Sequence, residues 1–263
     1  MEEPGTIYFT GTAGAGKTTC VRAFADWMRT AGYDATVVNL DPGLEDTTFE
    51  PDVDVREWVR LAEIQDEYGL GPNGAQVAAA DMIALKIFDI KQAVAELKSD
   101  YVLVDTPGQI ELFAFREASK AIVDALSGDR SAIAFLFDPA LARNPGGFVS
   151  LAMLSATVEF RFRLPMLNLL AKADVLTPAQ LEEVVGWSDD RERLYEAVTR
   201  DAPTPDVQLS TELFRAIEAM GPLLGLVPTS AKEGTGLEAF YQAAQRLFAG
   251  GEDLELSHAP TND

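Results

Sequence analysis

The segment GTAGAGKT, residues 11–18, constrains what this chain can fold into more than any other part of it. It matches the pattern GxxxxGK[ST] at every defined position. A β-branched and aromatic run precedes it over residues 6–10, and apolar residues at helical spacing follow it over residues 19–30. In a strand, loop and helix of this kind, backbone N–H groups converge on phosphate oxygens at the helix N-terminus. The sequence therefore predicts a site for a nucleoside triphosphate.

Each position of this loop has an expected role. Glycine has no Cβ, so the backbone can approach a phosphate closely. Lys17 is expected to reach the β- and γ-phosphates, and the Thr18 hydroxyl is expected to bind Mg²⁺. The other residues of the segment that we expect to contact the nucleotide are Gly11, Ala13, Gly14, Ala15, Gly16 and Thr19.

The net charge of −21 narrows the class of partners. So acidic a surface argues against direct nucleic-acid binding, because phosphate backbones repel it. Two explanations stay open: an acidic face for a basic partner, or an acidic surface of the kind that suits a high-salt cytoplasm, where screening removes the self-repulsion. The acidic residues are spread along the whole chain, which favours the second explanation.

Length and hydropathy indicate a single globular domain. No apolar run is long enough to span a bilayer, and the first residues lack the basic and then apolar pattern of a secretion signal. We therefore expect a cytoplasmic protein that makes no membrane contact. Residues 1–249 are predicted to form one domain, and the polar residues 250–263 to form a disordered tail.

Alternating strand and helix signals predict a doubly wound α/β fold with a mainly parallel sheet. The strand candidates are near-continuous apolar runs, as expected for strands that are covered on both faces. These strands are predicted at residues 6–10, 35–40, 101–105, 132–138, 166–170 and 224–228. Helical patterns are predicted at residues 19–30, 110–127, 147–162, through 178–220, and at 236–249.

One stretch interrupts this alternation between the second and third predicted strands. Residues 41–100 show no convincing strand, and a connection of about sixty residues is normally functional. Amphipathic patterns at 59–68 and 76–97 flank the tripeptide Gly71-Pro72-Asn73, which we expect to lie in a loop. We therefore predict a helical insertion that carries a loop.

The segment DTPGQ, residues 105–109, follows an apolar strand and carries the second metal contact that such a site needs. Asp105 at the end of that strand is expected to hold Mg²⁺. Gly108 can bring its N–H close to a γ-phosphate. The alternative is an ordinary turn, since Pro-Gly is a common turn pair. A segment of this type is typical of GTPases rather than of most ATPases.

The segment AKAD, residues 171–174, stands where GTPases carry the base-reading pattern [NT]KxD. Asp174 is expected to accept hydrogen bonds from the ring N–H and amine of guanine, and the Lys172 stem to lie over the purine. Ala171 replaces Asn, and the loss of one neutral hydrogen bond costs about 1 kcal/mol. A second base-contacting loop is predicted over Ser230, Ala231 and Lys232. A surface loop with a helix cap is the alternative.

Asp41 follows the second predicted strand. A carboxylate at that position can face the metal or the attacking water. An ordinary Asp-Pro turn is the alternative, and on this pattern alone the two are equal. The segment DVRE, residues 54–57, is either part of the site or a solvated acidic helix start.

Taken in order, GTAGAGKTT, NLDPG, DVRE, Gly71-Pro72-Asn73 and DTPGQIELF resemble the GPN-loop GTPase family, and the resemblance covers nearly the whole chain. It implies a dimer in which the Asn73 of one copy lies near the γ-phosphate bound by the other. It also implies that Asp41, Asp105, Gln109 and Glu111 surround the metal and the attacking water. Relatives in eukaryotes are linked to the assembly of RNA polymerase, so polymerase subunits or chaperones are the implied partners.

We therefore expect a homodimeric GTPase that uses Mg²⁺ to convert GTP to GDP and phosphate. Phosphoryl transfer needs donors directed at the γ-phosphate, and a neutral Asn amide supplies no charge, which suits a slow switch. Two alternatives stay open. One is a GTP-dependent scaffold or assembly factor with negligible turnover, and the other is an ATP-using small-molecule kinase or ATPase on the same fold.

Overall fold

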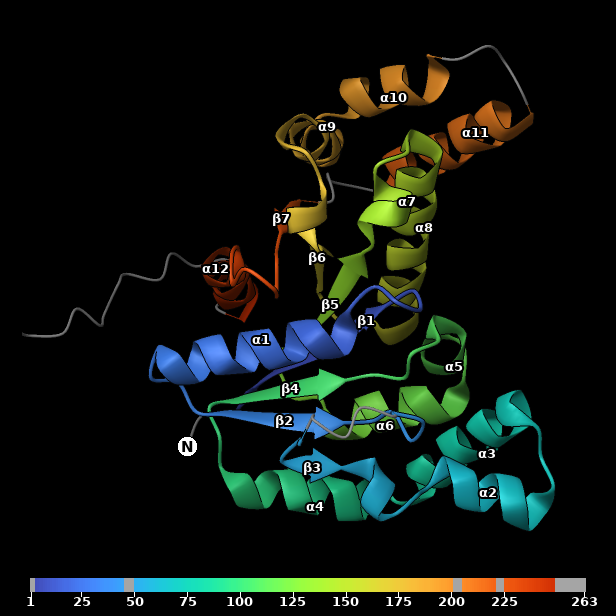
Figure 1. Cartoon of the computed structure of the whole chain (residues 1–263), viewed down its shortest axis with the longest axis vertical. Helices are drawn as coiled ribbons and strands as arrows, with labels where there is room; N and C mark the ends of the chain where they lie inside the picture. The colour runs from blue at the N-terminus through green and yellow to red at the C-terminus, as the bar shows by residue number, and fades with distance from the viewer. Residues whose placement is uncertain (1–2, 45–49, 201–204, 221–224, 249–263) are drawn as a thin grey trace, which may run out of the picture.

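The computed structural model describes residues 3–44, 50–200, 205–220 and 225–248, and its centre is a parallel β-sheet (Figure 1). Within these ranges seven strands lie in the order β3-β2-β4-β1-β5-β6-β7, and every neighbouring pair is parallel. This confirms the predicted α/β fold. The strands are β1 (Gly5–Gly11), β2 (Ala35–Asn39), β3 (Val53–Asp54), β4 (Tyr101–Asp105), β5 (Ser131–Phe137), β6 (Met166–Leu170) and β7 (Leu226–Pro228).

Helices cover both faces of this sheet (Figure 1). On one face α1 and α12 share an apolar cluster with β1, β4 and β5, and on the other face α3, α4, α6 and α8 do so. Trp187 of α9 packs against Phe148 of α8, and the group α9 to α11 lies at the top of Figure 1. The helices are α1 (Lys17–Thr30), α2 (Leu61–Tyr68), α3 (Pro72–Leu85), α4 (Ile87–Leu97), α5 (Ile110–Ala114), α6 (Glu117–Leu126), α7 (Pro139–Ala142), α8 (Pro145–Phe162), α9 (Pro178–Asp189), α10 (Arg191–Thr199), α11 (Pro205–Met220) and α12 (Leu237–Phe248).

The central strands owe their composition to this double covering. Every residue of β1, β4 and β5 is buried. Because neither face of these strands meets solvent, their sequences do not alternate between polar and apolar residues. Because all strands run in one direction, their carboxyl ends meet at one edge of the sheet. The phosphate loop follows β1 at this edge, Asp105 ends β4, and Asp41 lies two residues beyond the end of β2.

The segment between residues 41 and 100 differs from the prediction of a stretch without strands. The two-residue strand β3 pairs with β2 at the edge of the sheet, through Val38 with Val53 and Asn39 with Asp54. Two residues are too few to give an alternating pattern. The helices α2, α3 and α4 therefore lie between β3 and β4.

Helix boundaries differ from the prediction at three places. The helix expected over 76–97 is interrupted at Lys86, and the one expected over 110–127 is interrupted at Phe115 and Arg116. The tripeptide from Gly71 begins a helix rather than forming a loop, with Gly71 as N-cap and Pro72 as the first residue of α3. Proline suits that position because its fixed φ is already helical. Residues 201–204, 221–224 and 249–263, which include Leu224 and the predicted tail, lie outside the described residues.

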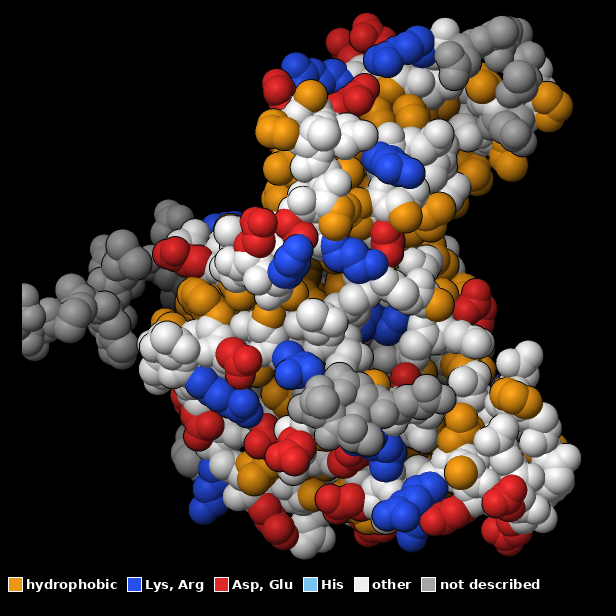
Figure 2. Space-filling view, in the orientation of Figure 1, with side chains coloured by type: hydrophobic (Ala, Val, Ile, Leu, Met, Phe, Trp, Pro, Cys, Tyr) orange, Lys and Arg blue, Asp and Glu red, His pale blue; other side chains and the backbone are white. Residues whose placement is uncertain are grey.

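Charged side chains of both signs are interspersed over the face in Figure 2, and the acidic ones form no single patch there. This distribution agrees with the even spread of acidic residues along the chain. In the part of the chain that the structure describes, no helix is long and apolar enough to cross a membrane.

Phe24 tests the packing of α1 on the sheet. Its ring is fully buried and lies 4.3 Å from the ring of Phe240, centroid to centroid, and 6.2 Å from that of Phe9. We expect Phe24→Ala to lower the free energy of unfolding by about 3–5 kcal/mol through the cavity that it leaves. In the same urea titration, Phe160→Ala, at a side chain that is 81% exposed, should change it by less than about 0.5 kcal/mol. Equal losses in the two variants would contradict the packing described.

Candidate nucleotide-binding site

The glycine-rich loop between β1 and α1 has a backbone that only glycine accepts at two points. An ideal Cβ on Gly11 would lie 2.9 Å from the backbone oxygen of Leu136, so a side chain would not fit. Gly16, the N-cap of α1, has a φ of 93°, in the left-handed region that L-residues avoid. The loop therefore leads directly into a helix N-terminus, where the N–H groups favour anions.

Lys17 holds this loop to the DTPGQ segment. Its Nζ donates to the backbone oxygens of Gly11 and Thr12 at 3.3 Å and of Gly108 at 2.9 Å. Burial lowers the pKa of Lys17, and the carboxylates of Asp105 and Asp41 oppose that shift. A buried ammonium that bonds only neutral carbonyls has a strong preference for an anion, and phosphate oxygens supply one.

Thr18 and Asp105 are joined at the first turn of α1. The Thr18 hydroxyl donates to Asp105 Oδ2 at 2.6 Å. Asp105 is fully buried, and its Oδ1 has no hydrogen-bond partner among the described residues. The pKa of Asp105 is raised to about 7, mainly by burial. The Asp41 carboxylate also raises this pKa, and the Thr18 hydrogen bond and the Lys17 charge lower it.

This pair fits a magnesium ion. Mg²⁺ prefers oxygen ligands, and it is commonly held by one or two protein oxygens while phosphates and water supply the others. Asp105 Oδ1, a buried carboxylate oxygen without a partner, is the kind of atom that such a cation satisfies. In the described ranges no group of three or more His, Cys, Asp or Glu residues forms a metal site of its own.

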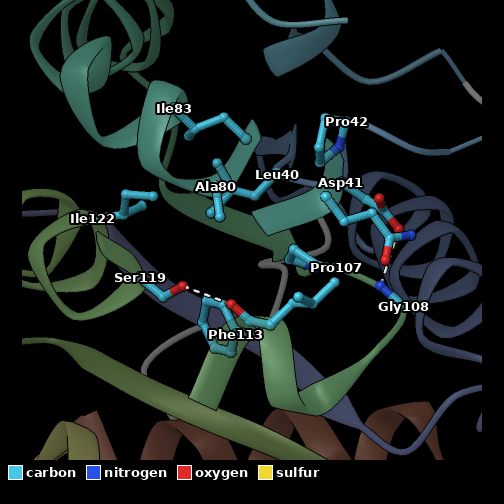
Figure 3. Close-up of a pocket in the computed structure, with 12 residues that line it drawn as sticks. Leu40, Asp41, Pro42, Ala80, Ile83, Pro107, Gly108, Phe113, Ser119 and Ile122 are labelled. Atoms are coloured by element: carbon cyan, nitrogen blue, oxygen red, sulfur yellow. Dashed lines mark hydrogen bonds between the residues drawn. The ribbon is translucent and has the colours of Figure 1, made fainter. Parts of the chain in front are cut away.

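Asp41 joins the loop after β2 to the DTPGQ segment. Its Oδ1 accepts from the Gly43 N–H at 2.9 Å. Its Oδ2 accepts from the Gly108 N–H at 3.0 Å (Figure 3). Asp41 therefore does more than form a turn, which was the alternative in the sequence. Its carboxylate bonds two backbone N–H groups here, next to the groups expected to hold metal and phosphate.

Asn39 is a site residue that the sequence reasoning missed. It is fully buried, its Nδ2 donates to the backbone oxygen of Asp41 at 3.1 Å and to Asp54 Oδ1 at 3.0 Å, and its Oδ1 accepts from the Asp41 N–H. Arg56 binds the same Asp54 through Nε and Nη2. Burial raises the pKa of Asp54, but the hydrogen bonds from Arg56 and Asn39 outweigh it and leave the pKa below its usual value. An amide at the end of a buried strand was the available signal.

Lys172 lies over the phosphate loop. Its Nζ donates to the backbone oxygen of Gly14 at 2.5 Å and to Asp138 Oδ2 at 2.9 Å, and its Cε lies 3.4 Å from an ideal Cβ on Gly16. The stem therefore lies beside the phosphate loop, and its expected position over the purine stays a prediction. Asp138 was missed, although a carboxylate just beyond β5, the neighbour of β1, was a usable signal.

The two predicted base-contacting loops meet at Asp174 and Ser230. The Ser230 hydroxyl donates to Asp174 Oδ1 at 2.6 Å and accepts from the Glu233 N–H at 3.1 Å. Asp174 Oδ2 makes no hydrogen bond within the described residues. Ala171 is buried at the end of β6, whereas Ala231 and Lys232 lie at the surface of the second loop.

Three of the expected catalytic residues lie apart from this network. Gln109 and Glu111 are exposed at the start of α5, and Asn73 is exposed in the first turn of α3. Within the described residues, no hydrogen bond joins their side chains to the phosphate loop or to Asp105. The contacts of Lys17, Thr18 and Asp105 therefore form the centre of the site, and the roles of Gln109, Glu111 and Asn73 stay predictions.

The parallel sheet, the glycine-rich loop after β1 and the buried Thr18–Asp105 pair define the class: this is a P-loop nucleotide-binding protein.

Comparisons with known proteins narrow the class. A family described as "Conserved hypothetical ATP binding protein" matches residues 9–250. The GPN-loop GTPase PAB0955 of Pyrococcus abyssi is 30% identical over 94% of this chain and 99% of its own length. Its solved structure, described as a GTPase in apo form, has a TM-score of 0.83 at 28% identity and covers 92% of this chain and 97% of that one. GPN-loop GTPase 1 of Dictyostelium discoideum is 28% identical over 92% of this chain, but this chain spans only 61% of that relative's length.

The chain belongs to the GPN-loop GTPases, a family of GTP hydrolases, as its ordered motifs predicted.

The raised pKa of Asp105 gives a pH test of the site. In metal-free protein the pKa of about 7 keeps the Asp105 proton bound up to about that pH, whereas the unfolded chain releases it near the ordinary aspartate pKa of 3.8. Because the folded state binds more protons between these values, stability should fall as pH rises through that interval. Measured with a chelator present, thermal unfolding of Asp105→Asn should lose this pH dependence. Equal pH profiles in Asp105→Asn and the unchanged chain would contradict the assignment.

Proposed function

We propose that this chain hydrolyses GTP to GDP and phosphate with Mg²⁺, as a homodimer whose conformation depends on the bound nucleotide. One chain of contacts carries the proposal. Lys17 and Thr18 bond Gly108 and Asp105 of the DTPGQ segment, and Gly108 in turn bonds Asp41. The phosphate loop is therefore joined directly to the DTPGQ segment and, through Gly108, to the loop after β2. The arrival or loss of the γ-phosphate must rearrange contacts in both loops.

Each residue then has a distinct task. Lys17 and the backbone N–H groups of the phosphate loop hold the phosphates. Thr18 and Asp105 hold Mg²⁺, which neutralises charge on the phosphate oxygens. Asp41 and Gln109, with Glu111 nearby, orient the attacking water. Asp41 acts as a carboxylate hydrogen-bond acceptor, since it already accepts two N–H groups at this edge of the sheet.

Asn73 is the residue that a second copy would supply. It is exposed, and it stands in the first turn of α3, whose N-terminus carries partial positive charge. The helix itself is anchored in its own chain through Ala75, Ala79 and Ile83, all buried. An amide fixed on one protomer and facing outward can donate to the γ-phosphate of another, but it adds no full charge. We therefore expect slow turnover.

The trans role of Asn73 can be tested by mixing variants. Asn73→Ala should lower kcat for GTP about tenfold or more, because one donor to the transition state is lost, and leave GDP affinity unchanged. Lys17→Ala should not bind nucleotide. An equimolar mixture of the two should recover activity, up to about a quarter of the unmixed wild-type rate, because half of the dimers are mixed and each of these holds one complete site. A mixture as inactive as its components would contradict the trans role.

Guanine preference rests on Asp174. One of its oxygens is held by Ser230 and the other is left for the base, which suits the paired N–H donors of guanine. The family description names ATP, whereas the relatives are named GTPases, so the base needs a direct measurement. A preference of the unchanged chain for ATP would favour the kinase or ATPase alternative.

Asp174→Asn should lower GTP affinity about tenfold or more, because a charged acceptor is lost, and leave the weaker ATP binding unchanged. Isothermal titration with both nucleotides measures this. Asp26→Asn, at an exposed carboxylate on α1, is the matched control and should change neither affinity. An equal loss of GTP and ATP affinity in Asp174→Asn would remove this residue from base recognition.

We also propose that hydrolysis resets a surface that binds another protein during assembly of a complex, with RNA polymerase subunits or chaperones as partners. The support is a set of large apolar side chains left exposed on the insertion and on α8: Leu85 at 82%, Phe88 at 81% and Phe160 at 81%. Apolar side chains of this size commonly mark interaction surfaces when they are adjacent. The alternative of a scaffold with negligible turnover differs from this proposal only in the rate of GTP hydrolysis.

A further inference from the structure

Gln76 carries a buried polar atom that the described residues do not satisfy. Its Oε1 is out of contact with solvent and has no hydrogen-bond partner. A carbonyl oxygen buried in this way destabilises the state that buries it. A buried acceptor of this kind calls for a hydrogen-bond donor.

The surroundings of Gln76 are the loops that contact phosphate. Together with Asp41, Pro42 and Gly108 it lines a small cavity of about 30 Å³. The lining also includes Ala80 and Ile83 of α3 (Figure 3). Its Nε2 lies 3.9 Å from an ideal Cβ on Gly43. Rotation of the terminal amide by half a turn exchanges Nε2 and Oε1 at almost no cost in shape. The oxygen can therefore face the Gly43 backbone.

Asp41 at present holds the donor that Gln76 lacks. Its carboxylate accepts from the N–H groups of both Gly43 and Gly108. When that carboxylate turns toward water at the γ-phosphate, the Gly43 N–H loses its acceptor and would be left unpaired. After the terminal amide has rotated, Gln76 Oε1 faces this N–H as an unpaired acceptor, so each group can satisfy the other.

Gln76 also stands one helical turn beyond Asn73 on α3, at the i, i+3 spacing that makes two side chains neighbours. The helix is held farther along by Asp81, whose carboxylate accepts both hydrogen bonds from Arg116 Nη2 at 2.8 Å. A new bond at Gln76 therefore acts on the N-terminal turn, the part of the helix that carries Asn73.

We infer that Gln76 is a positioning residue: it exchanges a hydrogen bond with the Asp41–Gly43 loop of its own protomer and thereby sets how that protomer presents Asn73 to the partner's site. This role rests on the proposed function, because it requires that Asn73 acts in trans. It makes the catalytic state of one site depend on the nucleotide held in the other.

Gln76→Met removes the oxygen and keeps the length of the side chain. We expect kcat for GTP to fall about fivefold, the value of one neutral hydrogen bond, with KM and GDP affinity unchanged. The melting temperature of the nucleotide-free chain should stay the same or rise, because the unpaired buried oxygen is gone. A side chain that only supports the fold would lower that temperature. Gln92→Met, at an exposed glutamine of α4, is the control and should alter none of these values.

Mixed dimers show which of the two active sites Gln76→Met affects. Dimers are purified from two differently tagged chains, one carrying Asn73→Ala, so that a single site receives Asn73. Gln76→Met on the chain that keeps Asn73 should slow hydrolysis at that site. The same substitution on the chain that carries Asn73→Ala should leave the rate unchanged. The reverse pattern would show that Gln76 acts on its own active site and would overturn the inference.

The same set separates the two proposals. Full activity of the Asn73→Ala homodimer would overturn the trans mechanism in the proposed function. Reduced activity of Asn73→Ala together with full activity of Gln76→Met would overturn the role of Gln76 alone.

Discussion

The hydrogen bond from Thr18 to Asp105 is the contact on which the rest of the site depends. It places a fully buried carboxylate at the end of β4 against the first turn of α1, where Lys17 supplies the nearby positive charge. Burying a charge is costly unless it is paired and hydrogen-bonded. Asp105 is only partly satisfied, since one oxygen lacks a partner. The nucleotide-free fold therefore keeps a site that a metal and a phosphate complete together.

The elements around this contact were predictable because their signals are local. The bounds of β4 and β6 were predicted as observed, since each is a near-continuous apolar run that a polar or turn-forming segment ends. The phosphate loop follows from its glycines and its flanks. The parallel direction of the strands then brings Asp41, Asp105 and the segments after β6 and β7 to one edge without further information. Local pattern and topology together were enough for that part of the site.

Residues whose role comes from a distant partner could not be found in this way. Asn39 is important because β3 brings Asp54 beside it, and β3 is too short to leave a pattern. Asp138 is important because Lys172 reaches it from the end of another strand. The helix break at Arg116 contains no glycine or proline that would predict it. Arg116 has an extended backbone there, and its side chain forms an ion pair with Asp81 on α3. In each case a contact between residues far apart in the sequence determines the structure, and the local sequence carries no pattern for it.

The same reasoning bears on why Asn73 faces outward. Four buried residues, Ala75, Ala79, Ala80 and Ile83, fix α3 in the core of its own chain, and the Asp81–Arg116 pair holds it at the surface. A helix anchored so firmly cannot swing its first turn into its own site without loss of that packing. The cavity beside Gln76 leaves room for its side chain to change its hydrogen bonds without moving this packing. The anchoring therefore suits a donor offered to another molecule, and the cavity suits one whose aim can be adjusted by the loops of its own site.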